Sequence, residues 1–90
     1  MKKNILITGI TGQDGIFLVN ELLTYEKDAE IVGFSRQKNN QNFFNKLNYL
    51  NPKLDLNNLK IININQDNQV QVDDIISSYK PNFIYNFTFN

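Results

Sequence analysis

Cysteine, histidine and tryptophan are absent from this 90-residue chain, and arginine occurs once, as Arg36. Without cysteine and histidine the chain has no disulfide, no thiolate nucleophile, no imidazole base and no zinc site of the usual kind. Nine basic side chains balance nine acidic ones, and the pI is about 6.1. Proteins held on nucleic acid by phosphate neutralisation carry a basic excess, so we expect no nucleic-acid partner.

Long apolar runs are lacking as well. Two lysines near the N-terminus precede only Ile5-Leu6-Ile7 before Thr8 and Gly9 interrupt the run. A secretory leader needs about 7–15 apolar residues and a membrane-spanning helix about 20. We therefore expect no leader and no membrane partner, and a cytoplasmic location.

The length allows one small domain, which buries only about 60% of its unfolded surface. Short apolar runs alternate with amphipathic segments along it. Strands are expected at 4–8, 31–35, 61–64 and 82–87, and helices at 13–25, 43–50 and 70–79. Pro52 and Pro81 end the second and third helices. This alternation predicts βαβ units and a parallel sheet, and right-handed crossovers give the strand order 3-2-1-4.

Three glycines at a spacing of three follow the first strand and open the first helix, in the run Thr8-Gly9-Ile10-Thr11-Gly12-Gln13-Asp14-Gly15. Gly9 would permit the tight turn, Gly12 would let the backbone approach a pyrophosphate, and Gly15 would let the helix pack closely on the sheet. The helix N-terminus would then bind the phosphates. The pattern predicts an α/β fold with a partial Rossmann-type parallel sheet of four strands and flanking helices. The alternative is a glycine-rich turn without a ligand.

Arg36 follows the second strand, where dinucleotide-binding folds discriminate between cofactors. Arginine there accommodates a 2′-phosphate, whereas an acidic residue would bind the ribose 2′-hydroxyl, so Arg36 favours NADP over NAD. The alternative is a solvated surface arginine. Asp14 either contacts the ligand or interacts with the helix dipole as a cap.

The loop resembles the N-terminal loop of the GDP-mannose 4,6-dehydratase family, whose members are extended short-chain dehydrogenases/reductases. The run Gly12-Gln13-Asp14-Gly15 is more typical of this family than of related epimerases or reductases. Lys80-Pro81-Asn82-Phe83-Ile84-Tyr85-Asn86 resembles that family's fourth strand, and Ile31-Val32-Gly33-Phe34-Ser35-Arg36 its second. The resemblance implies that the chain, residues 1–90, is the N-terminal part of an NADP-binding Rossmann domain without the substrate domain.

The family converts GDP-mannose to GDP-4-keto-6-deoxymannose with bound NADP, in nucleotide-sugar metabolism leading to GDP-fucose, and its full-length members are expected to be homo-oligomers. The resemblance implies these cofactor-binding residues: Gly9, Ile10, Thr11, Gly12, Gln13, Asp14, Gly15, Arg36, Asn65, Gln66 and Phe87. Three positions depart from the family. Asn65 stands where the family has Asp, and Thr88-Phe89 replace a Gly-Ala pair beside the nicotinamide ribose.

The family's catalytic Thr or Ser, Glu and Tyr-x-x-x-Lys pair lie beyond residue 90. Tyr49 and Lys53 match the Tyr–Lys spacing, but Pro52 between them breaks the helix that would align them, so the match is interpreted as chance. No catalytic residue is therefore assigned to this chain.

Three hypotheses follow. The first is the N-terminal part of a GDP-mannose 4,6-dehydratase. The second is a non-catalytic or vestigial NADP-binding module, motivated by Thr88 and Phe89 and by the missing catalytic residues. The third is another extended-family enzyme, a sugar-nucleotide epimerase or reductase, against which Gln13-Asp14 weighs. With strand four as an exposed edge, we expect marginal stability or aggregation.

Overall fold

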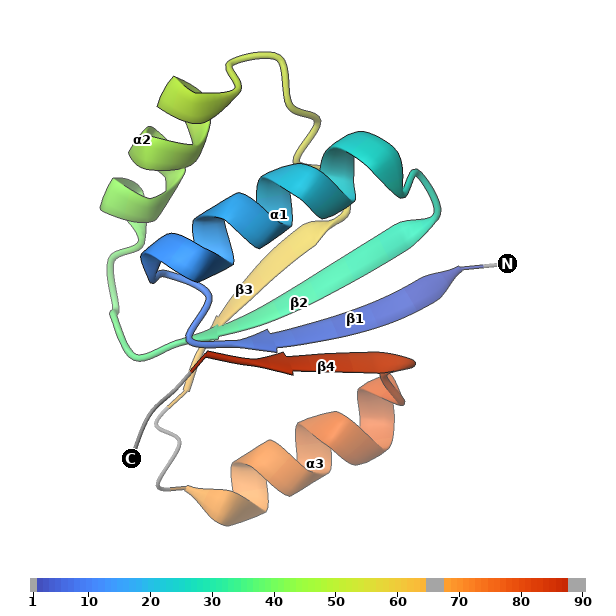
Figure 1. Ribbon diagram of the computed structural model, residues 1–90. Helices are drawn as coiled ribbons and strands as arrows, with labels where there is room; N and C mark the ends of the chain where they lie inside the picture. Colours follow the sequence, from blue (N-terminus) through green and yellow to red (C-terminus); the bar gives the residue numbers. More distant parts are fainter. Residues whose placement is uncertain (1, 65–67, 88–90) are drawn as a thin grey trace.

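The computed structural model describes residues 2–64 and 68–87 (Figure 1). Within these ranges strands and helices alternate: β1 (Lys3–Thr8), α1 (Gln13–Tyr25), β2 (Ala29–Ser35), α2 (Gln41–Leu50), β3 (Leu59–Asn63), α3 (Gln69–Tyr79) and β4 (Phe83–Asn86). The strands pair in parallel in the order β3-β2-β1-β4. The predicted α/β class, Rossmann-type parallel sheet and strand order are confirmed.

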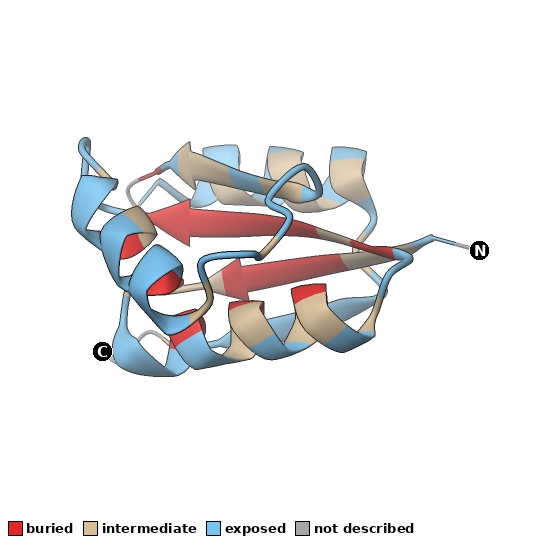
Figure 2. Ribbon diagram, turned by 90° about the horizontal axis from the view of Figure 1, so that it is seen from above, coloured by how far each residue is buried: buried red, intermediate tan, exposed pale blue. Residues whose placement is uncertain are grey.

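The two central strands hold the most deeply buried side chains (Figure 2). In β1, Ile5, Leu6 and Ile7 are each at most 2% exposed. Successive side chains of a strand point to opposite faces of the sheet, so this run needs cover on both sides. The prediction of a strand buried on both faces is confirmed.

Helices α1 and α2 lie on one face of the sheet and α3 lies on the other (Figure 1). The α1–α2 face has the larger core: Ile5, Ile7, Ile10, Ile16, Val19, Leu23, Ala29, Ile31, Phe43 and Leu47. The opposite face buries Leu6, Val32, Phe34 and Ile64, against which α3 packs only partly buried side chains. Across the described ranges, no helix is both long and apolar enough to cross a membrane.

The observed strand ends differ from the expected ones because backbone pairing, and not apolar content, decides where a strand begins. Strand β2 starts at Ala29, two residues earlier than expected, since Ala29 pairs with Lys3 of β1. Strand β3 starts at Leu59, which pairs with Ile31, and it ends at Asn63. The predicted third strand was therefore placed too late in the sequence.

Strand β4 is an exposed edge. Among the described strands it pairs with β1 alone. Phe83, Ile84 and Tyr85 are 50%, 53% and 37% exposed. Unpaired strand edges with apolar side chains favour association with other chains. The expected exposed fourth strand is confirmed.

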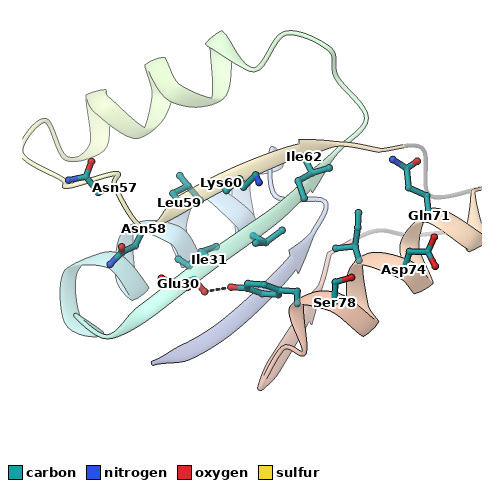
Figure 3. Close-up of a pocket in the computed structure, with 13 residues that line it drawn as sticks. Glu30, Ile31, Asn57, Asn58, Leu59, Lys60, Ile62, Gln71, Asp74 and Ser78 are labelled. Atoms are coloured by element: carbon teal, nitrogen blue, oxygen red, sulfur yellow. Dashed lines mark hydrogen bonds between the residues drawn. The ribbon is translucent and has the colours of Figure 1, made fainter. Parts of the chain in front are cut away.

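A cavity of about 590 Å³ lies between α3 and the β2–β3 side of the sheet (Figure 3). Its lining includes Glu30, Lys60, Ile62, Asp74 and Ser78. Helix α3 has no fully buried residue, so it leaves part of this face uncovered. Glu30 is near the start of β2, which places the cavity toward the amino ends of the strands. The glycine loop follows β1 at the opposite, carboxyl end.

Lys80, between α3 and β4, adopts a left-handed conformation with φ 52° and ψ 63°. Its N–H donates to the Ile76 carbonyl oxygen at 2.9 Å, which closes the helix. A side chain with a Cβ is strained in this conformation by about 1 kcal/mol, and glycine is not.

We expect Lys80→Gly to raise the free energy of unfolding by about 0.5–1 kcal/mol, because glycine relieves this strain. Urea denaturation measures the change. Lys80→Ala is the matched control, since it removes the charge and keeps the strained Cβ. A stabilisation by alanine equal to that by glycine would contradict the explanation.

The Tyr79 hydroxyl, at the end of α3, donates a hydrogen bond to the Glu30 carbonyl oxygen at 2.7 Å (dashed line in Figure 3). Burial raises the pKa of Tyr79 above its ordinary value of 10.0. The folded chain therefore holds this proton more tightly than the unfolded chain does. The resulting stabilisation is present below pH 10.0 and is lost as the pH rises through the raised pKa.

Tyr79→Phe should therefore reduce stability at pH 8 by about 0.5–1.5 kcal/mol, the net value of one hydrogen bond. The variant should also lose less stability than the parent between pH 9 and 11.5. Unfolding free energies across this range measure both effects. Tyr25→Phe is the control, because Tyr25 is 73% exposed. Parallel pH profiles for the parent and Tyr79→Phe would refute the assignment.

Candidate phosphate-binding site

The glycine loop joins the carboxyl end of β1 to the start of α1. Gly9 has φ 67°, a backbone conformation that favours glycine. The Gly12 N–H donates to the Gly9 carbonyl oxygen at 3.2 Å, which closes the turn. The predicted role of Gly9 in the tight turn is confirmed.

Ile10, in the middle of the loop, is a core residue. Its side chain is fully buried, and it lies between α1 and β2. A Cβ at Gly15 would lie 2.6 Å from the Ile10 carbonyl carbon, and one at Gly33 would lie 2.9 Å from Ile10 Cγ2. Gly15 therefore lets α1 approach the Ile10 backbone of the loop closely, whereas the prediction was a close approach to the sheet. Gly33 makes room for the Ile10 side chain, a role that no local pattern in the sequence predicts.

Gly12 differs from the other loop glycines. Its φ of −73° suits any residue, and an added Cβ would meet only the Gly9 carbonyl oxygen, at an ordinary 3.5 Å. Gly12 is also exposed. The fold itself therefore does not require glycine here, whereas close approach of a ligand to the backbone does.

Gly12 is also the N-cap of α1, and no side chain caps this helix. The first N–H groups of a helix have no intrahelical partners, so they are oriented to bind an anion. Thr11 is half-buried, and Gln13 and Asp14 are exposed in the first turn. The Asp14 carboxylate lies where it interacts favourably with the helix dipole. Geometry and dipole together provide a cradle for a phosphate group.

The loop lies beside the point where the sheet reverses its direction of winding, between β1 and β4. Here the Thr8 hydroxyl donates to Asn86 Oδ1 at 2.6 Å, and the Phe87 N–H donates to the Thr8 carbonyl oxygen at 3.0 Å. The half-buried Phe87 packs against the α1–α2 core. Open α/β sheets bind ligands in the crevice at such a switch point, outside the carboxyl ends of the strands.

Arg36 lies in the exposed segment that follows β2. Among the described residues it forms no ion pair, since those present join Lys2 to Glu30 and Lys3 to Glu26. The guanidinium is therefore available to an anionic ligand. Asn65 and Gln66, which were assigned to the same cofactor, lie outside the described residues, as do Thr88 and Phe89.

Tyr49 and Lys53 do not form a catalytic pair. Helix α2 ends at Leu50, and Tyr49 is 91% exposed on it. Lys53 follows Pro52 in the exposed connection to β3. The two residues do not share a helical turn, which supports interpreting their spacing as chance.

The sequence matches the family described as GDP-mannose 4,6 dehydratase over residues 6–88. No curated protein matches it. The fold resembles dTDP-glucose 4,6-dehydratase (rfbB) from Bacillus anthracis str. Ames in complex with NAD, with a TM-score of 0.70 and 21% identity. The match covers 98% of this chain and 27% of that one, so this chain spans about a quarter of the length of that structure.

The loop glycines are expected to respond differently to alanine. Gly12→Ala should change the free energy of unfolding by less than about 1 kcal/mol, because its backbone and surroundings accept a Cβ. Gly15→Ala should destabilise by about 1–3 kcal/mol, because the Cβ overlaps the Ile10 backbone. Chemical denaturation of both variants measures the difference. Equal losses would show that the fold itself requires Gly12.

Proposed function

The chain belongs to the GDP-mannose 4,6-dehydratase family, and from this premise we propose that it binds NADP as the N-terminal part of a GDP-mannose 4,6-dehydratase. The observation that carries the proposal is the glycine at position 12. The fold does not require glycine there, whereas a pyrophosphate that approaches the backbone closely does. NADP, when bound, would supply the hydride acceptor and donor for converting GDP-mannose to GDP-4-keto-6-deoxymannose.

The pyrophosphate would be held by backbone groups. The backbone from Gly9 to Gly12 would border it, and the N–H groups of Gln13, Asp14 and Gly15 begin the helix that points toward it. The Ile10 side chain packs into the core, so only its backbone is available to the ligand. Charge stabilisation would come from the helix dipole and the aligned amides, because no lysine or arginine lies in this loop.

Arg36 supports NADP over NAD, because an exposed guanidinium directly after β2, with no ion pair among the described residues, suits a 2′-phosphate. The similar dTDP-glucose 4,6-dehydratase structure holds NAD, which supports a nicotinamide dinucleotide for this fold and makes NAD the ligand to compare with NADP. Asn65 and Gln66 would contact the adenine side of the cofactor, and Phe87 would border it at the end of β4.

The alternative is a non-catalytic NADP-binding module. Thr88 and Phe89 stand where the family has small residues, which favours this alternative. Both proposals require dinucleotide binding, and they separate on whether a longer polypeptide supplies the Tyr-x-x-x-Lys pair and the substrate domain. Sequence downstream of residue 90 that encodes this pair would support the dehydratase, and unrelated sequence there would support the module.

Dinucleotide binding is tested by thermal unfolding of the chain with NADP, NAD or neither. Ligand at a hundredfold excess over Kd stabilises the folded state by about 2.7 kcal/mol, which shifts the Tm of a domain this size by about 10–20 °C. We expect the larger shift with NADP. Without ligand, Gly12→Ala should have the same Tm as the parent. With NADP or NAD, its Tm should not shift. Arg36→Met should lose the preference for NADP and keep the response to NAD.

Lys38→Met is the matched control for Arg36→Met, because Lys38 is an exposed cation of the same segment. No Tm shift at millimolar NADP or NAD would contradict the proposed function. Equal responses of the parent chain to both dinucleotides would contradict only the choice of NADP.

A further inference from the structure

The segment that carries Arg36 is anchored by a side chain from the neighbouring strand. Asn63 is the last residue of β3 and pairs in register with Ser35, the last residue of β2. Its Nδ2 donates to the Gln37 carbonyl oxygen at 2.7 Å and to the Ser35 carbonyl oxygen at 3.3 Å. One amide group therefore binds the two carbonyl groups on either side of Arg36.

A second set of hydrogen bonds holds the same segment from within. The Ser35 side chain is only 3% exposed. Its hydroxyl oxygen accepts the Gln37 N–H at 3.1 Å, and the hydroxyl donates to Asn40 Oδ1 at 2.8 Å. The residues before and after Arg36 are thus fixed by Asn63 and Ser35 together, although the segment is exposed.

We infer that Asn63 is a positioning residue for Arg36. By positioning Arg36, Asn63 sets the preference of this site for a dinucleotide with a 2′-phosphate. The inference rests on the proposed function, since it concerns how that site selects NADP. A fixed backbone lowers the ordering cost when Arg36 engages an anion, and a guanidinium binds phosphate well only in the correct orientation. NAD lacks the 2′-phosphate, so its affinity should not depend on Asn63.

Leucine is the informative replacement at Asn63. It has a similar size and no N–H donor, and Asn63 is exposed, so the fold should tolerate it. An aspartate would place a negative charge near the ligand phosphate. The loss of the N–H donor could then not be separated from charge repulsion. Asn57→Leu is the matched control, because Asn57 is an exposed asparagine that precedes the other end of β3.

The test measures Kd for NADP and for NAD in the parent chain, in Asn63→Leu, in Arg36→Met and in the double variant. Asn63→Leu should lower the NADP-over-NAD preference by about three- to tenfold, as expected for the loss of one or two hydrogen bonds. Binding of NAD should be unchanged. In the Arg36→Met background, Asn63→Leu should have no further effect, because Asn63 acts through Arg36.

Amide hydrogen exchange in the free chain provides a readout independent of the cofactor. The Gln37 N–H is hydrogen-bonded to Ser35, so it should exchange more slowly than the Lys38 N–H, and Asn63→Leu should accelerate its exchange. Equal weakening of NADP and NAD binding, or a full additional effect in the Arg36→Met background, would overturn the inference and leave the proposed function standing. A parent chain that binds neither dinucleotide would overturn both.

Discussion

The packing of Ile10 between Gly15 and Gly33 determines how α1 lies against the sheet, and the rest of the structure depends on this arrangement. This side chain is fully buried, and both glycines provide space that a Cβ would occupy. The contact sets how closely α1 approaches the sheet. It also fixes where the N-terminus of α1 opens, because Gly12 follows Ile10 by two residues. A packing contact in the core thus places the backbone groups of the candidate site.

The glycines of the loop therefore serve different physical requirements. Gly9 is required by its positive φ angle, and Gly15 is required by close packing against Ile10. Gly12 is required by neither. The spacing of three predicts all of these roles, because each follows from the geometry of a strand, a turn and a helix along one stretch of chain. The strand order was predictable for the same reason, since right-handed crossovers act on consecutive elements.

Features that depend on residues far apart in the sequence were not predictable. Gly33 carries no local signal, because its need for glycine comes from Ile10, which meets it only after β1 and β2 pair. Asn63 is one of sixteen asparagines, and nothing in its neighbours distinguishes it. Its role comes from the parallel register of β2 and β3, which brings its amide to the carbonyl groups beside Arg36. The early starts of β2 and β3 have the same origin in strand pairing.

The two faces of the sheet are covered unequally, and β4, an exposed edge among the described strands, is hydrogen-bonded to the residue that precedes the candidate site. Helices α1 and α2 bury a continuous core, whereas α3 buries no residue fully and β4 is an exposed edge. Strand β4 is joined to the site at Thr8. The Thr8 carbonyl oxygen accepts the Phe87 N–H, and the Thr8 hydroxyl donates to Asn86 Oδ1. Thr8 directly precedes Gly9. A ligand bound at the loop would bind only the folded chain, so its binding energy would stabilise β1, α1 and the β4 edge that Thr8 connects to them.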